Sequence, residues 1–163
     1  MITQAIVNSL FEYKDGQLFR KVKASQNTQI GDLAGYVDKK GYWRVGYKNK
    51  PYLLHRIIWL MHYGTLPKEL DHIDRNPQNN RIENLRIADR SQNNCNKQVY
   101  KTSSTGIKNV TWYKPTSKWM VKLTKNKKQM FFGYYDDLEL AELVAIEARD
   151  KYHGKFSQLN NGV

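Results

Sequence analysis

The chain has 163 residues, of which 40% are hydrophobic and 12% aromatic, a composition typical of a folded protein rather than a disordered one. Lysine and arginine outnumber aspartate and glutamate by 27 to 15, and the formal net charge of +12 indicates a polyanion or an anionic membrane surface as the partner. The single cysteine, Cys95, excludes an internal disulfide and a cysteine-rich zinc site, so any bound metal must use oxygen and imidazole ligands.

No apolar run approaches the ~20 residues that span a bilayer, and the N-terminus lacks the basic and small-residue features of a signal peptide. We therefore expect a cytoplasmic protein with no membrane partner. Residues 2–11 predict a short helix, and the following segment predicts a hairpin around Asp15 and Gly16.

A second hairpin is predicted between residues 35 and 56, where "YWRVGYK" alternates as a half-buried strand does. Residues 39–56 hold six basic side chains and no acid. They form either a solvated sheet face or a phosphate-binding face, and the absence of acids favours the second. The candidate phosphate contacts there are Arg44, Lys48, Lys50 and Arg56.

Residues 55–64, "HRIIWLMHYG", predict a buried helix that ends at Gly64, before Pro67. The stretch "LDHIDRNPQNNRIENLRIADRSQNNCN", residues 70–96, then carries seven asparagines. Part of it reads as an ordinary turn. A strand is indicated by the alternation of Ile82, Leu85 and Ile87, and the start of a helix by the capping pair Asp89 and Gln92. The predicted order is therefore strand, loop, strand, helix.

Four positions in this stretch suit phosphodiester hydrolysis, which needs a hard cation, a base for the water and a group that orients the base. Asp71 and Asn93 offer the oxygen ligands that Mg²⁺ prefers. His72 is a candidate general base, because histidine ordinarily titrates near pH ~6.5. Asn84 is a candidate for orienting its imidazole.

These residues resemble the HNH endonucleases of the phage homing type, which have the ββα-metal active-site fold. The resemblance is carried by "LLHRIIW" and by Asp71-His72, Asn80, Asn84-Leu85-Arg86 and Asn93. It implies that His72 is the general base, Asn84 its orienting partner, and Asp71 and Asn93 the ligands of Mg²⁺, with Mn²⁺ as a substitute. Asn93 stands where the broader HNH pattern has a histidine, as in the homing subgroup, and Asn94 is the alternative ligand.

The other histidines are expected to have no part in the chemistry. His55 belongs to the upstream "HR" of the resemblance and is interpreted as structural, whereas His62 and His153 are interpreted as polar surface residues.

Residues 97–105 are polar and aperiodic and predict a linker. Beyond them, residues 108–114, 118–125 and 128–135 predict three strands, and residues 136–154 predict a helix. Asp136 is the expected N-cap and Gly154 the expected end of that helix, with a stripe of alanines facing the sheet.

This second segment resembles the ethylene-response-factor (ERF) type DNA-binding domain, on the strength of Trp119, Gly133, the alanine-spaced helix, Gly154 and Asn160. The resemblance implies a sheet that lies in the major groove of double-stranded DNA. Seven lysines and no acid in residues 106–130 fit such a role independently. The candidate DNA contacts outside the first hairpins are Arg86, Arg90, Lys108, Trp112, Lys114, Lys118, Lys122, Lys125 and Lys127.

Together these patterns predict an α+β protein with a β-rich, DNA-contacting N-terminal extension. The predicted domains are an HNH nuclease at residues 1–96, a linker at residues 97–105, and an ERF-type domain at residues 106–160, with its three-stranded antiparallel sheet packed on one helix. The expected function is a Mg²⁺-dependent endonuclease that acts as a monomer in the cytoplasm, that of the host if a phage encodes it, and nicks one strand of DNA. The alternatives are a non-catalytic basic DNA-binding regulator that retains the HNH scaffold and, less favoured, an RNA-binding accessory protein.

Overall fold

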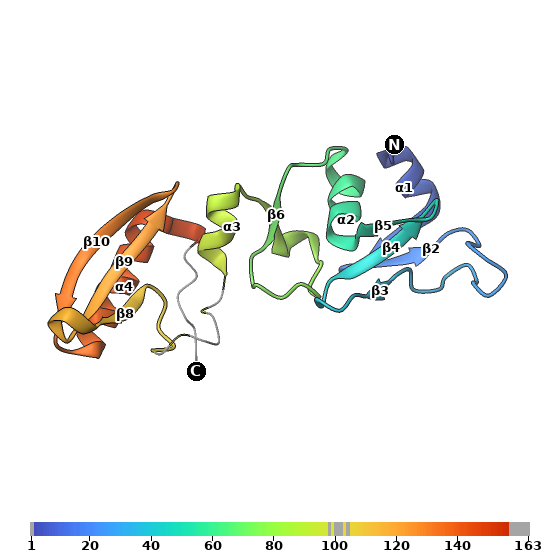
Figure 1. Ribbon diagram of the computed structural model, residues 1–163. Helices are drawn as coiled ribbons and strands as arrows, with labels where there is room; N and C mark the ends of the chain where they lie inside the picture. The colour runs from blue at the N-terminus through green and yellow to red at the C-terminus, as the bar shows by residue number, and fades with distance from the viewer. Residues whose placement is uncertain (1, 98, 100–102, 104, 157–163) are drawn as a thin grey trace. The chain divides into compact units, whose positions relative to one another are not determined.

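The computed structural model describes residues 2–97, 99, 103 and 105–156. The chain folds into two compact units, residues 1–87 and residues 88–163, and each is described by itself (Figure 1). Both contain helices and small antiparallel sheets, so the predicted α+β class is confirmed. None of the helices among the described residues has the length and apolar character that crossing a membrane requires.

The first unit begins with helix α1 (Gln4–Leu10), capped by the Thr3 side chain, and the hairpin of β1 (Phe11–Lys14) and β2 (Gln17–Arg20). The predicted turn at Asp15 and Gly16 is confirmed, since both residues adopt the positive φ that a tight hairpin turn requires. A three-stranded sheet follows, in the order β3 (Tyr36–Val37), β4 (Trp43–Tyr47), β5 (Lys50–Leu53).

Helix α2 (Leu54–Tyr63) holds the centre of this unit's core. Ile57 and Ile58 are almost fully buried and belong to one cluster with Val7, Leu18 and Val45. The helix ends at Gly64, whose φ of +69° is the left-handed conformation that glycine adopts without strain, as predicted. Leu70 and Leu85 belong to the same cluster, so the core also fixes the segment after α2 that carries the candidate site.

The asparagine-rich stretch forms β6 (Leu70–His72) and β7 (Leu85–Ile87), which pair antiparallel, with the short 3₁₀ turn η1 (Ile82–Asn84) before β7. The prediction that Ile82 belongs to the second strand is wrong, because this residue lies in η1 and packs against the core from there. The predicted order of strand, loop and strand is otherwise present.

The second unit begins with helix α3 (Arg90–Asn96), whose predicted capping box between Asp89 and Gln92 is confirmed. The sheet has the order β10 (Lys128–Tyr135), β9 (Lys118–Lys125), β8 (Val110–Tyr113), and the 3₁₀ turn η2 (Lys114–Thr116) joins β8 to β9. Helix α4 (Leu138–His153) covers one face of the sheet, and the 3₁₀ turn η3 (Gly154–Phe156) follows it (Figure 1).

Ala141, Ala145 and Ala148 of α4 are buried, and the first two pack against Val110 and Val121 of the sheet, as the alanine stripe predicts. The N-cap of α4 is Asp137 rather than the predicted Asp136. Asp136 instead forms an ion pair with Lys118, at 3.0 Å.

The division between the two units falls between Ile87 and Ala88, whereas the sequence predicted a domain boundary after Asn96. Helix α3 packs within the second unit, where Cys95 contacts Phe156 and the Lys108 ammonium donates to the Cys95 and Lys97 carbonyls at the helix end. Residues 98, 100–102 and 104 of the predicted linker, and residues 157–160 of the predicted C-terminal domain, lie outside the described residues. The predicted functional domains stay a prediction.

Candidate active site

Strand β6 ends in two buried polar residues, Asp71 and His72, which are 6% and 7% exposed. The strand is short because the polar sequence after His72 bonds to itself as a loop. Asp71 lies opposite Arg86 in the β6–β7 register, and the Arg86 guanidinium donates from Nε (2.9 Å) and Nη2 (2.7 Å) to Asp71 Oδ2. A buried carboxylate needs such a partner, so this ion pair fixes the position of Asp71.

The imidazole of His72 is fixed by Asn80. His72 Nε2 lies 3.1 Å from Asn80 Oδ1, and Asn80 is only 1% exposed. The amide cannot be turned over without loss, because Asn80 Nδ2 donates to the Gln78 carbonyl at 3.1 Å. Nε2 is therefore the protonated nitrogen of neutral His72, and Nδ1 carries the lone pair that can accept a proton.

Asn84 holds the loop between the strands rather than the imidazole. Its carboxamide donates to Asp74 Oδ1 (2.9 Å) and to the Asn79 carbonyl (2.8 Å), and it accepts from the Asp74 amide (3.1 Å). Burial acts to raise the pKa of Asp74, but hydrogen bonds from Asn76, Asn84 and Asn79 outweigh it and lower the pKa. The orienting contact that the sequence assigned to Asn84 is thus made by Asn80, on the loop that Asn84 holds.

The N-terminal hairpin supports the same loop. The Tyr13 hydroxyl accepts from the Ile82 amide at 3.1 Å. A Cβ at Gly16 would come within 2.7 Å of the Arg81 nitrogen, so the turn of the hairpin lies directly against the backbone after Asn80. The extension that the sequence predicted to contact DNA therefore also has a structural role beside the site.

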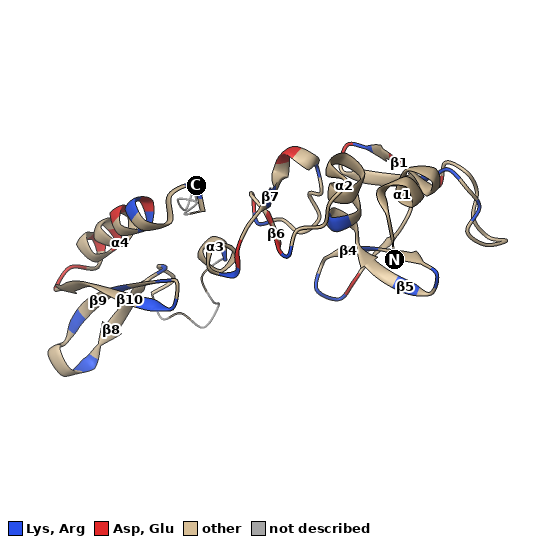
Figure 2. Ribbon diagram, turned by 90° about the horizontal axis from the view of Figure 1, so that it is seen from above, with Lys and Arg blue, Asp and Glu red and all other residues tan. Residues whose placement is uncertain are grey.

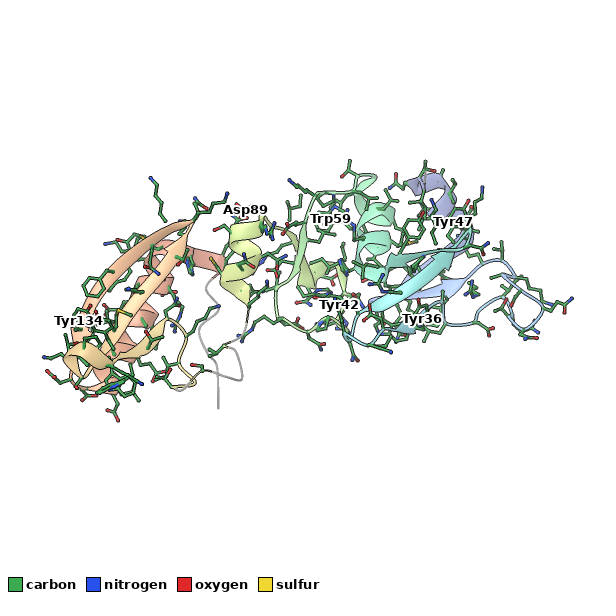
Figure 3. All side chains as sticks on the ribbon, viewed as in Figure 1. Tyr36, Tyr42, Tyr47, Trp59, Asp89 and Tyr134 are labelled. Atoms are coloured by element: carbon green, nitrogen blue, oxygen red, sulfur yellow. The ribbon has the colours of Figure 1, made fainter. Side chains whose placement is uncertain are left out.

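Two further rings pack around His72. The His55 ring meets it edge to face with centroids 4.9 Å apart, and Tyr42, labelled in Figure 3, lies 6.2 Å from it. Burial, with smaller contributions from the neighbouring His72 and Arg56, lowers the pKa of His55 to about 3, so His55 is neutral at physiological pH. Its place beside His72 is one that the sequence did not predict.

The remaining histidines are His62 of the first unit and His153 of the second. His62 is exposed and donates from Nδ1 to the Ile58 carbonyl at 2.9 Å, in keeping with a surface residue. His153 is half-buried with both ring nitrogens shielded from solvent, and burial lowers its pKa, so the interpretation of His153 as a surface residue is wrong.

The donors in the first unit suit a hard divalent cation, because Asp71 presents a carboxylate held in place at the strand end. Among the described residues, no three His, Cys, Asp or Glu side chains gather as a metal-binding group. Mg²⁺ binds one or two carboxylates and retains waters, so it does not require such a group. Asn93 is half-buried on α3 of the second unit, and Asn94 beside it is exposed.

Several cationic residues that the sequence assigned to DNA are engaged within their own unit. These are Arg44, which pairs with Asp38; Arg56, which donates to the Pro67 carbonyl; Arg86, which pairs with Asp71; Lys108, at the end of α3; Lys118, which pairs with Asp136; and Lys125, which donates to the Tyr152 carbonyl. Arg86 has a side chain only 13% exposed, so we reassign it from a DNA contact to the support of Asp71.

The other predicted DNA contacts remain accessible. Lys48, Lys50, Arg90, Lys114 and Lys127 are exposed, Lys122 is half-buried, and Trp112 is 43% exposed with its ring against Trp119. In Figure 2 the strands of the second unit carry basic segments and no acidic ones, whereas α4 carries acidic segments.

Comparisons with known proteins find relatives for part of the chain. Residues 52–95 match the HNH endonuclease family. Over 106 residues the chain is 33% identical to Protein 3.8 of Escherichia phage T7. This match covers 64% of this chain and 87% of Protein 3.8. The chain therefore belongs to the same family as Protein 3.8, and it contains an HNH endonuclease domain.

A second relative is the "Uncharacterized HNH endonuclease L560" of Acanthamoeba polyphaga mimivirus, which is 37% identical over 79 residues. That match covers 47% of this chain and 41% of the relative, so the chain spans less than half of that protein's length. No solved structure matches the chain.

Proposed function

We propose that the chain is a divalent-metal-dependent DNA endonuclease in which His72 is the general base. The observation that carries this proposal is the buried His72, whose Nε2 is held by Asn80 Oδ1 at 3.1 Å and which follows the buried carboxylate of Asp71 in the chain. The match of residues 52–95 to the HNH endonuclease family supports it.

His72 accepts a proton from the attacking water at Nδ1, because Nε2 already bears the hydrogen that faces Asn80. The Asn80 carbonyl then stabilises the imidazolium that forms, since it continues to accept from Nε2. His55 packs against the ring and, being neutral, adds no positive charge that would oppose protonation of His72.

Asp71 is the residue of the first unit that would hold the metal ion, and Arg86 keeps its carboxylate in place. When bound, Mg²⁺ would neutralise charge on the scissile phosphate and stabilise the leaving oxygen. Asn93 stays the predicted second ligand, with Asn94 as the alternative. Mn²⁺ is expected to substitute, because it accepts the same oxygen and imidazole donors.

The proposed substrate is double-stranded DNA, cut on one strand per binding event by a monomer. The net charge of +12 and the exposed lysines and arginine of both units favour a polyanion. An ERF-type DNA-binding role for residues 106–160 is part of this proposal, and the three strands followed by a helix support it.

The test is incubation of supercoiled plasmid with the full chain, in Mg²⁺ and in EDTA. We expect nicked circles in Mg²⁺ alone, with a 5′-phosphate and a 3′-hydroxyl at the nick. Asp71→Asn should raise the Mg²⁺ concentration required, because the amide is a weaker ligand than the carboxylate. The control Asp15→Asn changes the same charge in the β1–β2 turn, where asparagine is also favoured.

The same titration distinguishes the two asparagines of α3. A shift for Asn93→Ala and none for Asn94→Ala would support Asn93 as a ligand, and the reverse would move the ligand by one residue. Plasmid that stays supercoiled under all these conditions would instead favour a non-catalytic DNA-binding regulator.

A further inference from the structure

The sheet of the second unit has one face that α4 covers and one that it leaves open. Val110 and Val121 point to the helix and are buried, and alternation along each strand sends their neighbours to the other side. The registers Thr111↔Met120 and Tyr113↔Lys118 belong to that open face. In Figure 3, Tyr134 is labelled on this sheet.

A β-bulge brings two aromatic rings of β10 onto the open face together. Residues 131 and 134 are three apart, so a regular strand would point them to opposite faces. The register instead steps from Phe131↔Lys122 to Gly133↔Val121, which inserts Phe132 as an extra residue. Phe132 packs against the core, and Gly133 adopts a φ of +126° that other residues avoid.

The result is an aromatic patch of Tyr113, Phe131 and Tyr134. The Phe131 and Tyr134 rings lie 4.9 Å apart, and Tyr113 is stacked on Tyr134 with centroids 5.1 Å apart and planes at 28°. Phe131 is 53% exposed and Tyr134 is 40% exposed. The bulge places these two exposed rings side by side on the open face. Exposed rings in such an arrangement indicate a binding surface rather than a core.

Two lysines of β9 lie beside this patch, and one of them, Lys118, pairs with Asp136. Lys122 lies opposite Phe131 in the register, and Lys118 lies opposite Tyr113. Residues 97–135 contain nine lysines and no acid, and six of the second unit's seven acidic residues lie in residues 136–150. Accessible ring faces among lysines fit a polyanion that itself carries flat aromatic groups, which is the chemistry of a nucleic acid.

The rings favour unpaired bases over a duplex. In duplex DNA both faces of each base are stacked on their neighbours, and the grooves present only base edges and phosphates. Exposed aromatic faces are used when bases are unstacked, as in proteins that bind single strands.

We propose that the aromatic patch, with Lys122, binds single-stranded DNA by stacking its bases on Phe131 and Tyr134. This inference rests on DNA being the partner of the chain, as proposed above, and it does not require cleavage. For the open face of the sheet, it assigns an unpaired strand in place of the duplex contact that an ERF-type role implies.

The test measures binding by fluorescence anisotropy, with the full chain in EDTA so that no strand is cut. The probes are a labelled oligothymidylate, an abasic deoxyribose-phosphate strand of the same length, and a blunt duplex. The abasic strand keeps the phosphates and removes the bases, so it separates stacking from charge attraction. The variants are Phe131→Ala, Tyr134→Ala and Tyr134→Trp, and the control is Leu143→Ala, which removes a side chain that is 59% exposed on α4.

Stacking predicts that each alanine variant loses affinity for oligothymidylate by about 5-fold to 150-fold, the range measured per stacked base. Affinity for the abasic strand should stay unchanged, and Tyr134→Trp and Leu143→Ala should bind as the parent does. Unaltered circular dichroism and melting would show that the loss is not unfolding.

An alanine variant that loses duplex affinity and keeps oligothymidylate affinity would overturn the proposal in favour of a duplex-binding face. Equal losses on the abasic strand, or no loss at all, would also overturn it. Plasmid nicking by the parent is scored separately, so a failure of the nuclease proposal is distinguishable from a failure of this one.

Discussion

The two units carry their candidate functional groups in opposite ways. In the first unit Asp71, His72 and Asn80 are all less than 10% exposed and are held by hydrogen bonds, whereas in the second unit Phe131 and Tyr134 are 53% and 40% exposed on an open sheet. Proton transfer needs a base held in one orientation, and burial with hydrogen bonds provides that. Binding of a flexible polyanion needs accessible rings and charges. Substitutions should therefore affect stability and rate in the first unit, and affinity in the second.

The largest effect is expected from Arg86→Ala, which removes the ion-pair partner of the buried Asp71 carboxylate. Breaking one side of a buried pair costs about 3–5 kcal/mol. Urea denaturation should show this loss for the first unit. Arg86→Lys keeps the charge without the two-nitrogen contact and should lose less. An Arg86→Ala variant with the same free energy of unfolding as the parent would mean that the ion pair does not hold the Asp71 carboxylate in place.

The second effect is expected in the pH dependence of stability, to which His55 contributes. Its folded pKa of about 3 lies below the value of the unfolded side chain, so only the unfolded chain gains a proton as the pH falls below about 6.5. The stability that His55 contributes is complete above this pH and declines by about 1.4 kcal/mol per pH unit toward pH 3. His55→Gln should make melting less pH-dependent between pH 6.5 and 4.5 than in the parent. Parallel curves for the two proteins would show that His55 is protonated in the fold.

Asn80→Ala should slow nicking by about 10–100-fold, the usual cost of removing a group that orients a functional histidine. The pH dependence of the rate should also change, since Asn80 selects the tautomer of His72. Asn80→Asp is the informative companion, because it keeps the acceptor that faces Nε2 and should recover part of the rate. Asn84→Ala, by contrast, should act through loss of loop stability. Equal rates for Asn80→Ala and the parent would remove Asn80 from the site.

The smallest effect is expected for Lys122→Ala. Losing one phosphate contact lowers the slope of log affinity against log salt by about 0.7 for a single strand. Lys151→Ala, an exposed lysine of α4, makes the same change in net charge and should leave the slope unaltered. The comparison between units would be weakened if both variants changed the slope equally, since long-range charge rather than the open face would then explain binding.

The sequence predicted best those features that depend on neighbouring residues. The Asp15-Gly16 turn, the helix end at Gly64 and the Asp89–Gln92 capping box each follow from side chains within a few positions, and all are present. Two adjacent aspartates could each cap α4. The structure uses Asp137, whereas Asp136 pairs with the distant Lys118.

The features that sequence reasoning missed depend on contacts between distant positions. Asn80 belongs to the HNH-like motif, but nothing local indicates that its amide, rather than that of Asn84, faces His72. Alternation assigns Phe131 and Tyr134 to opposite faces, and only the pairing of β10 with β9 places the bulge between them. The glycine at position 133 was the available signal, since an isolated glycine within a strand indicates a bulge.

The most direct test of the central claim, that buried His72 is the base of a DNA nuclease, is single-turnover nicking of plasmid at saturating protein by His72→Ala. The control is His62→Ala, which removes an exposed histidine of the same unit. We predict that His72→Ala is slower by about 10²–10⁴-fold, the range for loss of a general base, while its affinity for the plasmid and the rate of His62→Ala stay within about twofold of the parent. Nicking by His72→Ala at a rate within a few-fold of the parent would contradict the account.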